Sequence, residues 1–153
     1  MSNYAYVATR ARSRRSRLLP AEAYNQLLNL EHAEIARYIQ DLEYRREIDR
    51  YGSTLSGADL IETALVDNLA KDVGDFLSFS KGKLRDILHV YAEKYRIENL
   101  KNIVRGINQN MDKQNLERLV CPINDSDKEL YNKLYDSKTV EDMISSLEGT
   151  SYY

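Results

Sequence analysis

Apolar residues recur at intervals of three and four along most of the chain, and no long stretch alternates apolar and polar positions. Residues at this spacing lie on one face of an α-helix. Only two prolines and six glycines interrupt the 153 residues, so few positions break a helix. The pattern predicts an all-α fold.

Two long amphipathic helices are expected in the middle of the chain, joined by the polar turn at 80–83. The first begins near Ser56, which with Asp59 resembles an acidic variant of the capping box. Helices joined in this way bury both apolar faces most economically as a long antiparallel hairpin, which is expected to form the core. The two apolar stripes are Leu60, Ile61, Ala64, Leu65, Leu69, Val73, Phe76 and Leu77, and Leu84, Ile87, Leu88, Tyr91, Tyr95, Ile97, Leu100, Val104 and Ile107.

Shorter helices are expected on both sides of the hairpin. Pro20 should separate the first helix from the second, and Pro122 with the polar cluster 124–127 should interrupt the region after the hairpin. The expected helices are 4–19, 21–30 and 31–44 before the hairpin, and 115–120, 128–135 and 139–148 after it.

A faint internal repeat appears when the sequence is shifted by 108 positions. It predicts a first helical repeat unit at 1–135 and the start of a second, truncated copy at 136–153, so that the chain is the front part of a longer repeated protein. The shift aligns Ile35 with Met143, Ile39 with Leu147 and Tyr44 with Tyr152.

Positive charge is concentrated near the beginning of the chain. The first twenty residues contain five arginines and no acid, whereas the remainder carries 17 basic and 24 acidic residues. An acidic body with one basic end is not typical of a general polyanion binder. On the expected first helix, Arg10, Arg14 and Arg17 share one face, and the opposing stripe is Tyr4, Val7, Ala8, Ala11 and Leu18, with Arg15 among them.

Three uses of this arginine face remain open from the residues alone. Composition favours a solvated face that makes salt bridges with the acidic body. Nucleic-acid binding is a second possibility, although no helix-turn-helix or aromatic stacking platform accompanies the arginines. Membrane-surface insertion would be feeble, because the apolar side offers alanine where leucine or aromatic residues are needed.

No pattern of catalytic or metal-binding residues emerges. Glycine-rich phosphate motifs, cysteine pairs and the HExxH motif are absent from the sequence. His32 and His89 lie on different expected helices and are interpreted as surface or core-edge residues, and Cys121 as a small packing residue. We expect no enzyme activity, cofactor or metal. The single cysteine, the lack of a signal peptide and the lack of a membrane span predict a reducing, cytoplasmic location.

The twelve tyrosines suit half-buried seams and interfaces. Tyr91 and Tyr95 are expected to pack in the hairpin. Tyr4, Tyr6, Tyr152 and Tyr153 lie at the ends of the chain and are less easily explained by a core.

Three phrases, at 4–24, 93–106 and 146–153, carry a resemblance to a known family and occur in that family's order. The first has a Tyr-small-Tyr pair, Ala-Arg, a basic run and Leu-Leu, and the third has a Leu-Glu-x-Thr-x-Tyr pattern. Together they resemble the C-subunit family of A/V-type ATP synthases, which is related to the d subunit of the vacuolar ATPase. The matching residues are Tyr4, Tyr6, Ala11, Arg12, 14–17, Leu18 and Leu19, then Ile97, Asn99, Leu100, Lys101, Ile103, Val104, Arg105 and Gly106, and finally Leu147, Glu148, Thr150 and Tyr152.

The resemblance implies an all-helical funnel of three related units around a pseudo-threefold axis. Such a protein sits on the membrane proteolipid ring at the cytoplasmic face, receives the foot of the central axle and transmits torque without an active site. Its partners are the axle subunits and the ring, with no nucleic acid. The expected partner-binding residues are Tyr4, Tyr6, Arg10, Arg14 and Arg17.

Members of the family are more than twice the length of this chain, which resembles their first third and the start of the second. Faces that meet the missing units would be exposed, which favours self-association or instability. The alternative function is a small helical nucleic-acid-binding or regulatory protein that uses the arginine helix.

Overall fold

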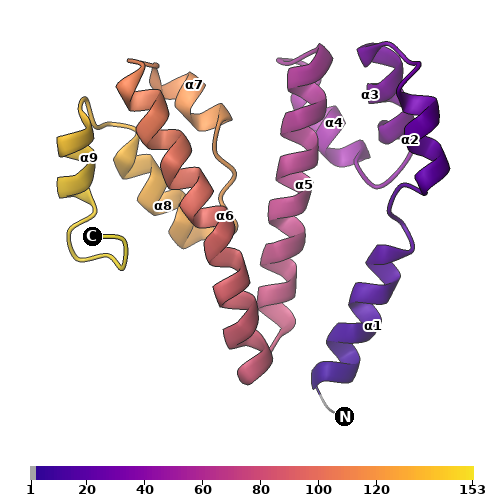
Figure 1. The fold of residues 1–153 in the computed structure, drawn as a ribbon, viewed down its shortest axis with the longest axis horizontal. Helices are drawn as coiled ribbons and strands as arrows, with labels where there is room; N and C mark the ends of the chain where they lie inside the picture. The colour runs from indigo at the N-terminus through magenta and orange to yellow at the C-terminus, as the bar shows by residue number, and fades with distance from the viewer. Residues whose placement is uncertain (1–2) are drawn as a thin grey trace. The chain divides into compact units, whose positions relative to one another are not determined.

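The structure is a computed structural model that describes residues 3–153, and over this range it consists of helices and turns without β-strands (Figure 1). The all-α prediction is confirmed. The chain divides into two compact units: unit 1 ends at Leu84 and unit 2 begins at Arg85.

Unit 1 is built around its longest helix. It contains α1 (Asn3–Arg15), α2 (Ala21–Leu27), α3 (His32–Gln40), α4 (Arg45–Tyr51) and α5 (Gly57–Phe79). Helices α3 and α4 pack beside α5 and against each other. The buried cluster between them consists of Ala36, Ile39, Ile48, Leu60 and Ala64, flanked by the partly buried Tyr38, Tyr44, Tyr51, Leu55 and Ile61.

Helices α1, α2 and α3 end three or four residues earlier than expected, and two further details of unit 1 also differ. Helix α4 was not expected, because Ile48 is the only aliphatic residue in its sequence RREIDRY and gives no apolar period. Ser56 is the N-cap of α5, but its side chain makes no capping hydrogen bond, so the predicted capping box with Asp59 is wrong. The start of α3 does have a side-chain cap, because the backbone N–H of Glu31 donates to Glu34 Oε2 at 3.0 Å.

Unit 2 contains most of α6 (Lys83–Asn108), together with α7 (Lys113–Arg118), α8 (Asp125–Leu134) and α9 (Val140–Ser146). The three short helices match the expected ones in number and place. Their apolar side chains form one cluster with the second half of α6. The buried members are Ile103, Ile107, Leu116, Val120, Tyr131, Leu134, Tyr135, Met143 and Leu147.

Local sequence explains where the short helices of unit 2 begin. Asp112, Asn124 and Thr139 are N-caps, and each accepts a hydrogen bond from the backbone N–H three residues later, at 2.8, 2.8 and 3.1 Å. These bonds satisfy donors that a helix start leaves unpaired. At Gly106, α7 approaches α6 so closely that an added Cβ would lie 2.3 Å from Leu116 Cδ2.

The two long helices lie close to their predicted bounds, with 23 residues in α5 and 26 in α6. Their buried positions differ in part from the predicted stripes: Leu69 and Ile87 are exposed, whereas Arg96 and Asn99 are buried. Each buried cluster lies within one unit. Because α5 and α6 belong to different units, their antiparallel pairing stays a prediction.

The repeat boundary at 135 and 136 also stays a prediction. The compact units divide elsewhere, and residues of 136–153 contribute to the core of unit 2. The aligned positions nevertheless have similar roles, since Ile39 and Leu147 are both buried and Tyr44 and Tyr152 each pack against the cluster of their own unit. Tyr152 is thus a core-edge residue, contrary to the expectation that the core would not explain it.

Truncation of Met143 tests the packing of α9 in unit 2. Its side chain is 1% exposed within the buried cluster, so Met143→Ala should lower the free energy of unfolding by about 2–5 kcal/mol, measured by urea denaturation. The neighbouring Ile144 is 50% exposed, so Ile144→Ala is the matched control and should change it by less than about 0.5 kcal/mol. Equal effects of the two variants would contradict the packing.

Candidate functional site

Arg14 is the centre of the contact between α1 and α5. Its two terminal nitrogens form ion pairs with Asp72 and Asp75, which lie three residues apart on α5. The guanidinium carbon also lies 5.2 Å from the centre of the Phe76 ring. One arginine therefore joins α1 to two carboxylates and an aromatic ring on the same helix.

Tyr6 and Arg10 extend this contact toward the end of α5. The Tyr6 ring meets Phe79 edge-on, with centroids 5.8 Å apart, and Arg10 Nε donates to the Tyr6 hydroxyl at 3.2 Å. Asn3 binds the same end: its Nδ2 donates to the Phe79 carbonyl at 3.0 Å, and its Oδ1 accepts from the Lys81 N–H at 2.8 Å. These bonds satisfy backbone groups that the end of α5 would otherwise leave open.

The other two predicted site residues are more exposed. Arg17 Nη1 lies 3.1 Å from Glu43 Oε2 and both side chains are about half exposed, so the pair is weakly stabilising. Tyr4 is 54% exposed. Tyr6, Arg10 and Arg14 of α1 therefore all contact α5, whereas Tyr4 and Arg17 lie outside that contact.

The face of α1 that meets α5 is not the expected one. Val7 is buried, but Ala8, Ala11 and Leu18 of the predicted apolar stripe are exposed. Of the arginine face, Arg14 is turned toward α5 instead, because its long side chain spans the space to α5, whereas alanine cannot. Periodicity alone did not reveal this, since it treats every arginine as a solvated residue. The interpretation from composition, salt bridges between the arginine face and the acidic body, is confirmed for Arg14 and Arg17.

The pKa of the Asp72 carboxyl reflects its position in this contact. Burial raises its pKa most, the charge of Arg14 lowers it, and the nearby Asp75 raises it again, with a net upward shift. Because the folded-state pKa lies above the unfolded one, Asp72 favours folding most when it is protonated. That contribution is present at low pH and is lost as the pH rises through the folded-state pKa.

A second polar constellation, in unit 2, was missed from the sequence. Arg96 is 7% exposed, its Nε donates to Asp127 Oδ1 at 2.9 Å, and its Nη1 donates to Glu93 Oε1 at 2.5 Å. Burial would lower the pKa of Arg96, but the bond to Glu93 and the charge of Asp127 outweigh it, so the pKa is raised. Asp127 Oδ2 also accepts the backbone N–H of Ile123 at 3.2 Å. A buried charge paired on both sides in this way fixes three segments relative to one another.

Tyr152 joins this network, and Asn99, one turn after Arg96 on α6, makes a separate pair of bonds. Asn99 Nδ2 donates to the Cys121 carbonyl at 2.9 Å, and its Oδ1 accepts the Cys121 N–H at 3.3 Å. The Tyr152 hydroxyl donates to Glu93 Oε2 at 2.8 Å. Burial raises the pKa of the neighbouring Tyr131 to about 12, so this phenol stays neutral at physiological pH.

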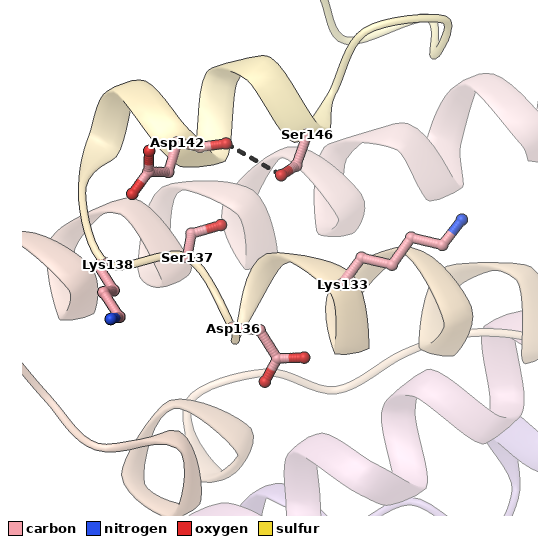
Figure 2. A pocket seen from close by; sticks show the side chains of 6 residues that line it. All are labelled: Lys133, Asp136, Ser137, Lys138, Asp142 and Ser146. Atoms are coloured by element: carbon pink, nitrogen blue, oxygen red, sulfur yellow. Dashed lines mark hydrogen bonds between the residues drawn. The ribbon is translucent and has the colours of Figure 1, made fainter.

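A shallow hollow lies between the end of α8 and α9 (Figure 2). Figure 2 shows the side chains of Lys133 and Lys138 extending in different directions. Asp136 is paired with Lys113 at 2.8 Å, and Ser146 donates to the Asp142 carbonyl at 2.9 Å. The polar side chains that line the hollow do not converge on one point. The lining residues are Lys133, Asp136, Ser137, Lys138, Asp142 and Ser146.

The two histidines lie in different units. His32 begins α3 and lines an apolar hollow with Ile35 and Ile61, and His89 is half-buried on α6. Tyr91 and Tyr95 pack against each other with hydroxyls 3.0 Å apart, and this bond raises the pKa of Tyr95 to about 12.

Residues 3–153 contain no group of three or more His, Cys, Asp or Glu side chains placed to hold a metal ion. Within the same range, no helix combines the length and the apolar character that crossing a bilayer requires.

Comparison with known proteins gives the family. The sequence profile described as ATP synthase (C/AC39) subunit matches residues 7–153, nearly the whole chain. The chain belongs to this family. It is similar to the C subunits of A-type ATP synthases, at 37% identity to that of Haloferax volcanii and at 35% to those of Archaeoglobus fulgidus and Methanosarcina acetivorans.

These alignments cover 98–99% of this chain but only 42–44% of the three relatives. The chain thus spans less than half the length of the C subunits that it matches. No solved structure matches it.

Two of the phrases that resemble the family meet in the polar network of unit 2. Asn99 belongs to the second phrase and Tyr152 to the third, and Tyr152 bonds Glu93 at the start of the second. In the third phrase, Thr150 Oγ1 donates to the Leu147 carbonyl at 2.7 Å and accepts the Tyr152 N–H at 3.2 Å. This turn directs Tyr152 back toward α6.

Removal of Asp127 tests the buried pair. Asp127→Ala removes the buried partner of Arg96, where both side chains are 9% exposed, and leaves only the more exposed Glu93, so it should lower the free energy of unfolding by about 3–5 kcal/mol in urea denaturation. Glu98→Ala, which breaks an exposed pair with Lys101 on the same helix, should have little effect. A small loss for Asp127→Ala would show that Glu93 alone is enough to compensate the buried guanidinium.

Arg14→Ala tests the attachment of α1. Loss of both ion pairs and the ring contact should increase opening of α1, so the amides of 3–15 should exchange with solvent about three- to tenfold faster in hydrogen-exchange mass spectrometry. Arg12→Ala is the control, because Arg12 is exposed on the same helix. If both variants accelerate exchange equally, Arg14 does not hold the helix.

Proposed function

We propose that the chain acts as part of the non-catalytic central-stalk subunit of a rotary A-type ATP synthase. In this role it couples the central axle to the membrane proteolipid ring during ATP-driven or ATP-synthesising ion transport. The observation that carries the proposal is the family match over residues 7–153, supported by relatives that are C subunits of A-type ATP synthases.

The geometry of the helices fits a coupling role. A torque-transmitting element needs stiff parts, and α5 and α6 are continuous helices of 23 and 26 residues, each with a packed cluster along part of its length. The buried network around Arg96 further resists deformation, because displacement of one segment would leave a charge unpaired.

The proposed partners are the axle subunits and the proteolipid ring, with the chain peripheral to the cytoplasmic face of the membrane. Tyr4, Tyr6, Arg10 and Arg17 are exposed, so we propose them as contacts with other subunits. Arg14 is engaged by two carboxylates of α5 and is better suited to hold α1 in place than to bind a partner.

The chain is too short to form the whole funnel that receives the axle. It covers 42–44% of the three relatives, so we propose that it provides one portion of a funnel built from three related units. Surfaces that meet the other portions would then be open to self-association.

Binding to the rotary complex tests this function. The probe is the A-type ATP synthase of Methanosarcina acetivorans prepared without its own C subunit, titrated with the full chain at several salt concentrations; duplex DNA is titrated in parallel. We expect saturable binding to the complex at physiological salt and poor binding to DNA. If the chain acted on nucleic acid through Arg10, Arg14 and Arg17, DNA affinity would fall with salt with a logarithmic slope of about −2.7.

Affinity for DNA without affinity for the complex would overturn the proposal in favour of a nucleic-acid-binding protein. The absence of binding to the complex at any salt concentration would also overturn it. A scrambled-sequence duplex serves as a control for non-specific association.

A further inference from the structure

We propose that the outer face of α1, formed by Ala5, Ala8, Arg12 and Arg15, docks onto an acidic helical surface of another protein in the rotary complex. These residues follow a spacing of three, four and three, so they lie along one line of the helix, and all four are exposed. The inference rests on the proposed function and identifies a contact that the sequence pattern did not single out.

The five arginines near the beginning of the chain differ in their contacts. Arg14 and Arg17 are paired with carboxylates of their own chain, and Arg10 bonds and stacks on aromatic rings. Within the part of the chain that the structure describes, the side chains of Arg12 and Arg15 have no hydrogen bond, ion pair or ring contact. Two guanidinium forks are therefore available to an external acid.

Local helix stability does not account for Arg12 and Arg15. Both lie in the last turn of α1, where a positive charge favours the helix, but Arg14 already supplies one there. Arg12 and Arg15 are three residues apart, so their like charges repel. An acidic partner would relieve this repulsion and satisfy both forks.

The shape of the face favours a protein helix as the occupant. Ala5 and Ala8 leave one end of the line without long side chains, so a helix can approach closely there while the two arginines reach around it. A lipid surface would require large apolar side chains, and this line has none. Two arginines are too few for strong nucleic-acid binding, since neutralising two phosphates gives a salt slope of only about −1.8.

The opposite side of the helix prepares this face for binding. Asn3 and Arg14 attach α1 to the end and side of α5, and Val7 is buried, so the backbone that carries Arg12 and Arg15 is already ordered. Docking then requires ordering of the two side chains rather than of the whole helix, which lowers the entropic cost.

The test compares two charge-matched double variants of the full chain, with the Methanosarcina acetivorans complex lacking its C subunit as the probe. Arg12→Gln/Arg15→Gln should weaken binding at least about tenfold, because two charge-assisted contacts are lost. Lys133→Gln/Lys138→Gln removes the same charge from exposed positions in unit 2, including the last turn of α8, and should leave affinity within about twofold. Circular dichroism and the hydrogen exchange of 3–15 verify that α1 remains folded.

Position 8 provides a second, independent readout. A photo-reactive amino acid at Ala8 should cross-link to a partner segment that carries Asp or Glu at helical spacing, identified by mass spectrometry, whereas the same group at the buried Val7 should not. Cross-links to lipid or nucleic acid would overturn the choice of a protein helix.

The outcomes separate this inference from the function on which it rests. Binding by the wild-type chain with equal losses in both double variants, or with no loss in either, would overturn the outer face and leave the proposed function standing. Failure of the wild-type chain to bind would overturn both.

Discussion

The buried guanidinium of Arg96 sets the architecture of unit 2. A charge at this depth is tolerable only if acids meet it, and the two acids come from different places: Glu93 from the preceding turn of α6, and Asp127 from α8. Each acid also binds a further segment, Asp127 through the Ile123 N–H and Glu93 through the Tyr152 hydroxyl. The apolar cluster supplies most of the burial, while this network specifies the arrangement in which the burial occurs.

Unit 1 attaches its first helix by different means. Val7 is the one buried residue among those described in α1, and the remaining contacts are ion pairs, ring contacts and the two bonds of Asn3. Contacts between partly exposed charges are screened by salt, whereas apolar burial is not screened. Helix α1 therefore belongs to the less stable part of the molecule, and the α3–α4–α5 cluster to the more stable part.

Periodicity predicted the helical class and the bounds of α5 and α6 closely, because these features follow from apolar spacing and turn residues alone. It failed where a polar side chain has a tertiary partner. Arg14 faces α5 because it pairs there with Asp72 and Asp75. Arg96 can be buried because it pairs with Asp127, which lies 31 residues later in the sequence. The family resemblance pointed to two of these polar residues, Asn99 and Tyr152, but did not predict their contacts.

The bond between Glu93 and Tyr152 has a consequence for how the protein is made. These residues are 59 positions apart, so a ribosome must complete residue 152 before Glu93 meets its tyrosine, whereas the α3–α4–α5 cluster is fully synthesised by Phe79. Domains generally fold in the order of their synthesis. Unit 1 can thus collapse early on the ribosome, while the emerging unit 2 keeps part of its apolar surface open and available to chaperones until its last turn has been translated.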